Sequence, residues 1–328
     1  MKLVPSFSVF RHRAYAQYWV MRQLLSGSRQ MQAVAIGWQV YDLARQTRSV
    51  EESAFILGLV GLAQFLPVLF LSLIGGQAAD RFDRRMILIV SNSGRVIASL
   101  ALIASVFMPA SSALPTVFAM AVVLGGVNAF APAASNALYP TLVPREDLAS
   151  AIAWNSLGFQ VSAVAGPALG GLLYALGGEI VYGVSTVMVV GAILAIAIAK
   201  TPKQAPVANA RGFAMAVEGL RYVRDNKIVL GAISLDLIVV FFGGATALLP
   251  VFARDILHTG AEGLGLLRAA PALGAAIVAF FLAVRPLDRK VGRWMLWAIV
   301  VYGAATLGFA WSKLFWLSMA MLAITGAA

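Results

Sequence analysis

The sequence contains no cysteine and only two histidines. Without cysteine, neither a disulfide bond nor a thiolate metal site can stabilise the fold. His12 and His258 lie far apart, and no His-Glu-x-x-His pattern occurs, which excludes that class of zinc hydrolase. A Gly-x-x-x-x-Gly-Lys-Ser/Thr phosphate loop is also missing, so the chain itself is not an ATP-driven pump. We therefore expect neither a metal nor a resident cofactor.

Charged residues are scarce as well. They make up 12% of the chain, whereas a soluble domain has about 25%. Hydrophobic residues reach 60%, and the mean hydropathy is +0.84. This composition leaves too little polar surface for a water-soluble globule and predicts an all-α membrane protein in a lipid bilayer. The net charge of +11 is dispersed among short links without a basic, aromatic-lined stripe, so no nucleic-acid partner is expected.

Apolar stretches long enough to cross a bilayer as helices, about 20 residues each, recur along the chain. The expected spans are 15–43, 54–79, 86–108, 114–138, 148–176, 180–199, 228–256, 262–284 and 292–310. A tenth span begins near Leu314 and is still apolar at Ala328, so we expect the chain to be cut within that helix.

Lysine and arginine favour alternate links between these spans. With the N-terminus placed in the cytoplasm, most of the 25 basic residues fall in cytoplasmic links. Links on the other side hold only Arg45, Arg48, Arg254 and Lys313. Basic residues concentrate on the cytoplasmic side of membrane proteins, so the pattern predicts a multi-pass protein with a cytoplasmic N-terminus.

One link is much longer than the others. It begins with the polar, proline-bearing stretch "KTPKQAPVANARG", and an apolar repeat at helical spacing follows. This pattern indicates a linker and an amphipathic helix on the cytoplasmic surface, with an ordinary loop as the alternative. We therefore predict an N-terminal six-helix half (1–199), a cytoplasmic linker with a surface helix (200–227) and an incomplete C-terminal half (228–328).

Charge is most concentrated in the short link "GGQAADRFDRR", residues 75–85. A related pattern, "DRKVGR" at 288–293, follows "DRFDRR" by 208 residues and occupies the corresponding link of the second half. Repeated halves related by an axis along the membrane normal are a transporter architecture. Dense charge between two helices can form a latch that breaks in another conformation. A basic anchor that only fixes orientation is the alternative.

The stretch resembles motif A of the major facilitator superfamily, Gly-x-x-x-Asp-Arg-x-Gly-Arg-Arg. The matching residues are Gly76, Asp80, Arg81, Arg84 and Arg85, with Asp288, Arg289 and Arg293 in the second-half echo. Asp83 replaces the second glycine of the motif, which raises the question of how the turn is formed. The resemblance implies a major facilitator fold of two six-helix halves. It also implies that the link is a cytoplasmic gate latch, whose aspartate interacts with an eleventh helix beyond residue 328.

The fifth span contains a second motif, "GFQVSAVAGPALGG". Small residues recur there every four positions, which places them on one helix face and is sufficient for close helix packing. The segment Gly166, Pro167, Gly170 and Gly171 is similar to the antiporter motif of the same superfamily, Gly-Pro-x-x-Gly-Gly. Together with "FAPAASNALYPTLVP" (130–144), it resembles the branch of enterobactin exporters and macrolide-efflux proteins.

Charges inside predicted spans are costly and indicate function. Asp236 is the only acid deep within a span, and Arg22 lies at a depth where the two could pair. Alternatively, Arg22 extends to the interface and Asp236 is structural. Arg29 and Arg268 lie deeper and would meet an anionic substrate, or helix carbonyls and water. These four residues are the candidates for substrate or proton coupling.

The resemblance implies a monomeric secondary transporter of the bacterial inner (cytoplasmic) membrane. It would export a small amphipathic molecule, siderophore-like or drug-like, by ion-coupled alternating access, with protons as one candidate for the coupling ion. One alternative is a truncated membrane protein that does not transport and instead assembles with a partner. A membrane-embedded enzyme is the other, but it would need clustered histidines or paired carboxylates, so we expect no enzyme.

Overall fold

In the computed structural model, residues 6–201, 212–242, 244–284 and 291–328 are described, and every regular element among them is a helix. The first group of long helices comprises α1 (Arg13–Arg45), α2 (Val50–Arg81), α3 (Arg84–Val106), α4 (Ala110–Leu138), α5 (Leu148–Leu176) and α6 (Gly178–Ile198). Short turns precede α1 and α5: η1 (Phe7–Arg11), η2 (Tyr139–Thr141) and η3 (Arg145–Asp147).

The second group begins with the link helix α7 (Gly212–Asp225) and continues with α8 (Lys227–Phe242), η4 (Gly244–Leu248), α9 (Leu249–Val251) and η5 (Phe252–Ile256). It ends with α10 (Ala261–Val284), α11 (Val291–Trp311) and α12 (Phe315–Ala327). The predicted surface helix is thus present as α7, which packs against α8 and α2, whereas the polar stretch 202–211 lies outside the described residues.

Helix positions agree with the predicted spans to within a few residues, except at the seventh. We predicted one span over 228–256, but α8 ends at Phe242 and three short turns follow. The sequence explains the break, because paired glycines at 243–244 favour a bend and Pro250 has no backbone N–H to donate. Within the described residues, seven helices are long and apolar enough to cross a membrane.

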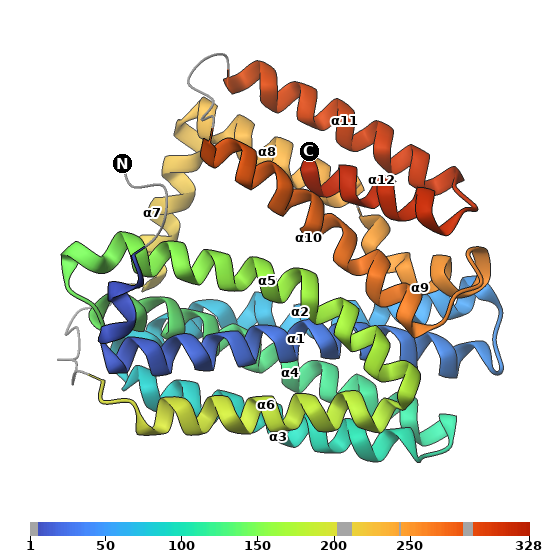
Figure 1. The fold of residues 1–328 in the computed structure, drawn as a ribbon, viewed down its shortest axis with the longest axis horizontal. Helices are drawn as coiled ribbons and strands as arrows, with labels where there is room; N and C mark the ends of the chain where they lie inside the picture. Colours follow the sequence, from blue (N-terminus) through green and yellow to red (C-terminus); the bar gives the residue numbers. More distant parts are fainter. Residues whose placement is uncertain (1–5, 202–211, 243, 285–290) are drawn as a thin grey trace.

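Helix α1 is not among those seven, although it has 33 residues. It runs through the middle of the first group, where it packs against α5 and α6 (Figure 1). Its polar side chains find partners there: Gln32 donates to Ser99 at 2.5 Å, and Gln39 donates to Ser105 at 3.0 Å. A helix can be this polar inside a membrane protein because neighbouring helices, rather than lipid, surround it and supply hydrogen-bond partners for its polar side chains.

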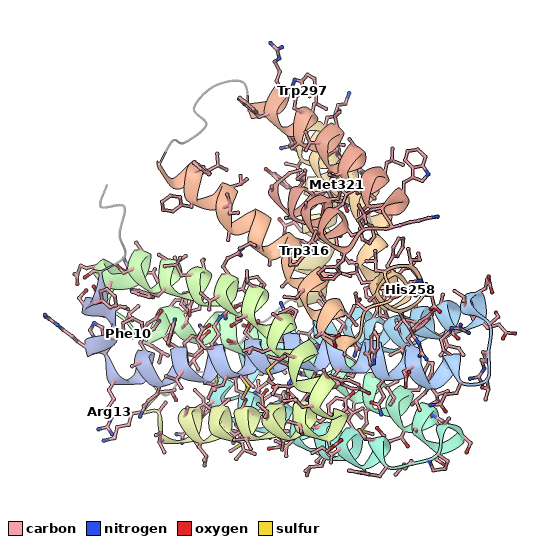
Figure 2. The ribbon with its side chains drawn as sticks, turned by 45° about the vertical axis from the view of Figure 1, so that its right-hand side comes forward. Phe10, Arg13, His258, Trp297, Trp316 and Met321 are labelled. Carbon is pink, nitrogen blue, oxygen red and sulfur yellow. The ribbon has the colours of Figure 1, made fainter. Side chains whose placement is uncertain are left out.

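The two ends of the first group can be followed in Figure 2. Phe10 and Arg13 lie at one end and His258 lies at the other. We call the first the basic end, since Arg84 and Arg85 at the α2–α3 link also lie there, and the second the opposite end. At the opposite end, Val34 of α1 joins Leu249, Leu264 and other side chains of the second group in one buried apolar cluster.

Candidate functional site

At the basic end, the motif arginines bind the carbonyl ends of three helices. Arg84 donates from Nε to the Ala79 carbonyl of α2 at 3.1 Å and from Nη1 to the Ala137 carbonyl of α4 at 2.6 Å. Arg85 donates to the Ala197 carbonyl of α6. The last carbonyls of a helix lack intrahelical partners and attract cations. The two arginines therefore fasten α2, α4 and α6 around the start of α3.

Asp83, which replaces the second motif glycine, is the N-cap of α3. Its carboxylate accepts a 2.8 Å hydrogen bond from the Arg85 backbone N–H. The φ angle of Asp83 is −59°, so the position does not require glycine. The departure from motif A is thus compatible with the turn and supplies a helix cap.

The remaining motif residues are less constrained. Asp80 is half-buried and Arg81 is exposed at the end of α2, and neither forms an ion pair within the described residues. A Cβ added to Gly75 would collide with the Ala129 carbonyl of α4, whereas a Cβ on Gly76 would meet nothing within 4 Å. Gly75, which we had not placed in the motif, is therefore the glycine that permits close approach to α4.

Arg293 is the residue of the second-half echo that the structure describes. Asp288 and Arg289 lie outside the described residues, and Arg293 is an exposed residue in the first turn of α11. The position of Arg293 parallels that of Arg85 at the start of α3.

The glycines of the antiporter-like motif lie at two helix interfaces. A Cβ at Gly166 would lie 2.5 Å from the Gln30 Cβ of α1, and one at Gly170 would lie 2.8 Å from the Met31 Cα. Gly171 faces the second group, where an added Cβ would be 2.9 Å from the Gly265 Cα of α10. Pro167 is buried between these contacts. The predicted packing face is thus present, and it joins α5 to both α1 and α10.

A polar pocket of about 260 Å³ lies between α1, α3, α4 and α5. Its lining includes three arginines, Arg22, Arg29 and Arg95. Its other polar residues are Ser26, Asn92, Asn128, Ser135 and Asn136, and its apolar ones are Met21, Leu25, Leu88, Ala131, Pro132 and Phe159. Among the described lining residues there is no acid. The sequence analysis assigned no role to Arg95, although a cation at the centre of the predicted span 86–108 was the available signal.

Neutral oxygens hold two of these arginines. Arg22 donates from Nη1 to the Tyr18 hydroxyl at 3.1 Å, to Ser135 at 3.3 Å and to Asn136 at 3.2 Å. Arg95 is only 5% exposed and donates from Nη2 to Asn128 at 2.8 Å. Arg22 is therefore held in the pocket wall by three hydrogen bonds.

The other two coupling candidates, Arg268 and Asp236, belong to the second group of helices. Arg268 of α10 donates to the Ala33 carbonyl of α1 at 3.0 Å, as the helix-carbonyl alternative predicted. Asp236 belongs to α8, but its side chain lies outside the described residues, so its pairing with Arg22 stays a prediction.

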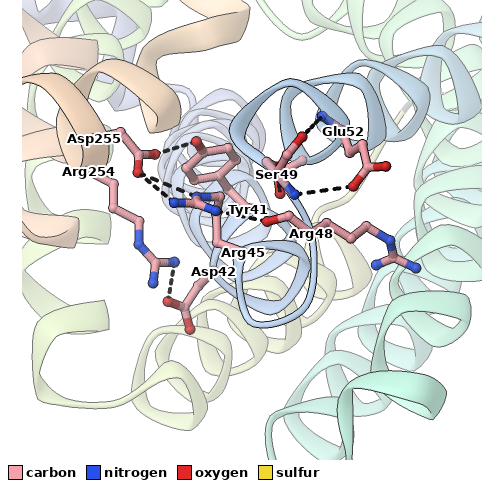
Figure 3. A network of polar contacts seen from close by, with 9 residues as sticks. Tyr41, Asp42, Arg45, Arg48, Ser49, Glu52, Arg254 and Asp255 are labelled. Atoms are coloured by element: carbon pink, nitrogen blue, oxygen red, sulfur yellow. Dashed lines mark hydrogen bonds and ion pairs between the residues drawn. The ribbon is translucent and has the colours of Figure 1, made fainter.

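At the opposite end, ion pairs join the two groups of helices (Figure 3). Arg254 of η5 pairs with Asp42 of α1 at 2.5 Å. Asp255 accepts from Arg45 at 3.2 Å and also from the Tyr41 hydroxyl. Each group thus supplies one cation and one anion. Sequence reasoning missed these contacts, although "YDLAR" and "ARD" place charges in links that are otherwise poor in them.

The family can now be assigned. A model of the family described as transmembrane secretion effector matches residues 4–328. The chain belongs to this family of the major facilitator superfamily. It is 26% identical to the enterobactin exporter EntS of Salmonella typhi over 81% of this chain and 62% of that protein. It is 28% identical to the uncharacterized MFS-type transporter YkuC of Bacillus subtilis (strain 168) over 59% of this chain and 47% of that protein.

Solved structures show the same fold. A D-xylose-proton symporter matches with a TM-score of 0.64 and 13% identity, covering 96% of this chain and 80% of that one. A bacterial homologue of the lysosomal transporter Spinster, in an inward-facing conformation, matches with a TM-score of 0.62 and 20% identity, covering 96% and 73%. The chain spans less than two thirds of the length of the curated relatives above.

Several predictions from the sequence are confirmed by this membership. The chain is an all-α, multi-pass membrane protein with the major facilitator fold, and it belongs to a family of membrane transporters. Members of this superfamily are transporters, so the membrane-embedded enzyme is excluded.

Proposed function

We propose that this transporter exports a small amphipathic molecule, siderophore-like or drug-like, by alternating access across the bacterial inner membrane. The support for export is the antiporter-like segment of α5 and the similarity to EntS, which is named as an enterobactin exporter. Residues 1–199 and 228–328 act in this proposal as two halves that rock about a central substrate site, with 200–227 as their cytoplasmic link.

The distribution of contacts between the two groups is the observation on which alternating access rests. The described polar contacts between them lie at the opposite end, as in Asp42–Arg254, or near mid-helix, as in Arg268–Ala33 and the 2.6 Å bond from Gln160 to the Ala272 carbonyl. Within the described residues, no hydrogen bond or ion pair joins the groups at the basic end, although the link helix α7 packs against α2. We infer a conformation closed at the opposite end and open at the basic end.

The basic end is the cytoplasmic one in this proposal, because arginine and lysine concentrate there. The absence of cysteine from the sequence makes the orientation easy to test. Single cysteines at Asn209 and Ser112 can be treated with an impermeant thiol reagent in intact cells. We expect labelling at position 112 and protection at 209, and preferential labelling of 209 would reverse the orientation.

Proton coupling is the finer part of the proposal. Asp236 and Arg22 are its candidates, because a carboxylate and a guanidinium that pair in one conformation can separate when a proton or substrate arrives. The motif residues Asp80, Arg81, Arg84 and Arg85 would stabilise the basic end when it closes.

The decisive experiment is transport by the full-length gene product. Enterobactin and a panel of amphipathic dyes are offered to everted membrane vesicles, with vesicles lacking the protein as the control. We expect uptake that needs no ATP and is abolished by a protonophore. Uptake of none of these compounds, despite correct insertion, would instead favour the non-transporting assembly partner.

A further inference from the structure

We propose that the pocket between α1, α3, α4 and α5 binds the oxyanion group of an organic anion, so that the exported molecule is an amphipathic anion. The inference rests on the proposed function and narrows its substrate class. It concerns the three arginines of the pocket, of which Arg95 had no role in the sequence-based prediction.

The depth of the charges is the first argument. Arg29 is the middle residue of α1, and Arg95 is the middle residue of α3. At 1.5 Å per residue, Arg29 lies about 24 Å from either end of its helix. Arg22 lies nine residues into α1, and the Arg29 side chain is exposed and lines the pocket. Arg22, Arg29 and Arg95 all line this one pocket. Neighbouring cations between membrane-spanning helices are stabilised by an anion, and such sites mark substrate or ion pathways.

The chain provides little compensation for these charges. Arg45 and Arg254 pair with acids at the opposite end, away from the pocket. The described hydrogen bonds of Arg22 and Arg95 go to neutral oxygens. Asp236, the predicted partner of Arg22, would neutralise only one of the three. At least two positive charges therefore remain for a ligand.

Unused hydrogen-bond donors are the second argument. The Nε of Arg95 is buried without an acceptor, and within the described residues Arg29 donates no hydrogen bond. A guanidinium has five N–H donors in a planar fork, which matches the two oxygens of a carboxylate. Asn128 and Asn136 hold their arginines through neutral oxygens, so they orient the cations without cancelling their charge.

The apolar wall indicates what else the ligand contains. Met21, Leu25 and Phe159 line the same pocket as the arginines. Its volume of about 260 Å³ is below the roughly 300–1,000 Å³ of pockets that enclose drug-sized ligands. The pocket therefore fits an oxyanion with the ring that bears it, and the rest of a larger molecule would lie outside it. Organic cations are excluded by repulsion.

A binding experiment tests the inference independently of transport. The purified protein is reconstituted in nanodiscs, and its thermal unfolding is followed while benzoate or the uncharged analogue benzamide is added. A ligand that binds only the folded protein raises the melting temperature in a saturable way. We expect this rise with benzoate and not with benzamide. Chloride at matched ionic strength serves as the inorganic anion.

Variants then localise the site. Arg29→Gln should weaken benzoate binding at least about tenfold, because each hydrogen bond to a charged group contributes that much or more. Arg29→Lys should retain part of the affinity. Arg145→Gln removes an exposed cation outside the pocket and should leave binding unchanged. Arg95→Gln tests the buried arginine, and its melting temperature without ligand reports whether it folds.

The outcomes separate the two proposals. Equal stabilisation by chloride, equal stabilisation by benzamide, or equal loss in Arg29→Gln and Arg145→Gln would each overturn the organic-anion site. Absence of benzoate binding in a protein that still exports its substrate would overturn this inference alone. Benzoate binding in a protein that transports nothing would overturn the export proposal and leave the anion site standing.

Discussion

The ion pair between Asp42 and Arg254 gives the most direct test of the closed opposite end. We predict that Asp42→Arg opens this end, and that the additional change Arg254→Asp closes it again by restoring the pair in reverse. Arg254 and Asp42 are 2.5 Å apart, with side chains that are 33% and 43% exposed. Exposed pairs contribute about 0.2–1 kcal/mol, so we assign about 1 kcal/mol to this half-exposed one.

Charge reversal replaces this attraction with a repulsion of similar size. The closed conformation should therefore lose about 2 kcal/mol relative to the open one, which corresponds to roughly a 30-fold change in their ratio. The second ion pair, between Arg45 and Asp255, is unchanged and still stabilises the closed conformation, so the ratio should not change further. The doubly reversed protein should return to within about threefold of the original ratio, because only the geometry of the pair differs.

Cysteine reactivity measures this ratio. Val34 is fully buried in the apolar cluster behind the ion pairs, and no native cysteine competes with a cysteine introduced there. A charged thiol reagent should modify Val34→Cys slowly in the parent, roughly 30 times faster after Asp42→Arg, and slowly again in the double reversal. Glu51→Gln changes an exposed acid at the same end that forms no ion pair in the described structure, so it should have no effect. An unchanged rate after Asp42→Arg, or a rate that stays high in the double reversal, would refute the gate.

Three further changes test the basic end and the coupling site. Gly75→Ala should lower the melting temperature, because its Cβ would collide with the Ala129 carbonyl. Gly76→Ala should be tolerated, and equal effects of the two changes in thermal unfolding would contradict the assigned packing. Asp80→Asn should reduce transport with normal insertion, measured as vesicle uptake and membrane expression, and full activity would reduce the stretch to an orientation signal. Asp236→Asn should abolish uphill export but leave downhill exchange in liposomes with an imposed pH gradient. Uphill export that survives this change would return Asp236 to a structural role.

Periodic and compositional signals were sufficient to predict most of the helices. Apolar length located the spans, and helical spacing in the long link located α7. The prediction of one continuous seventh span was wrong, because it used apolar length alone. The glycine pair and Pro250, which interrupt the helix, are both visible in the sequence. Local backbone chemistry, rather than hydropathy, determined where α8 ends.

The candidate site was less predictable, because its contacts join distant segments. Asp42 and Arg254 are brought together only by the packing of η5 against α1, which no local pattern encodes. The same holds for the arginine pocket: Arg29 and Arg95 come from different helices, and each appeared as an isolated charge. Motif A located Arg84 and Arg85, but their binding to the carbonyls of α4 and α6 required the helix ends in space.

The polarity of α1 has a consequence for how the protein is made. Two arginines inside this helix, Arg22 and Arg29, disfavour insertion by up to about 2.5–3.5 kcal/mol each, and five glutamines add to this cost. Helix α2, by contrast, has a mean hydropathy of 2.3 over its most apolar window. We therefore expect α1 to leave the translocon late, as one arm of a hairpin with α2. Helix α1 would then stay at the translocon until α3 and α6 have been synthesised. Ser99 of α3 and Tyr182 of α6 can then form hydrogen bonds with Gln32 and Gln39.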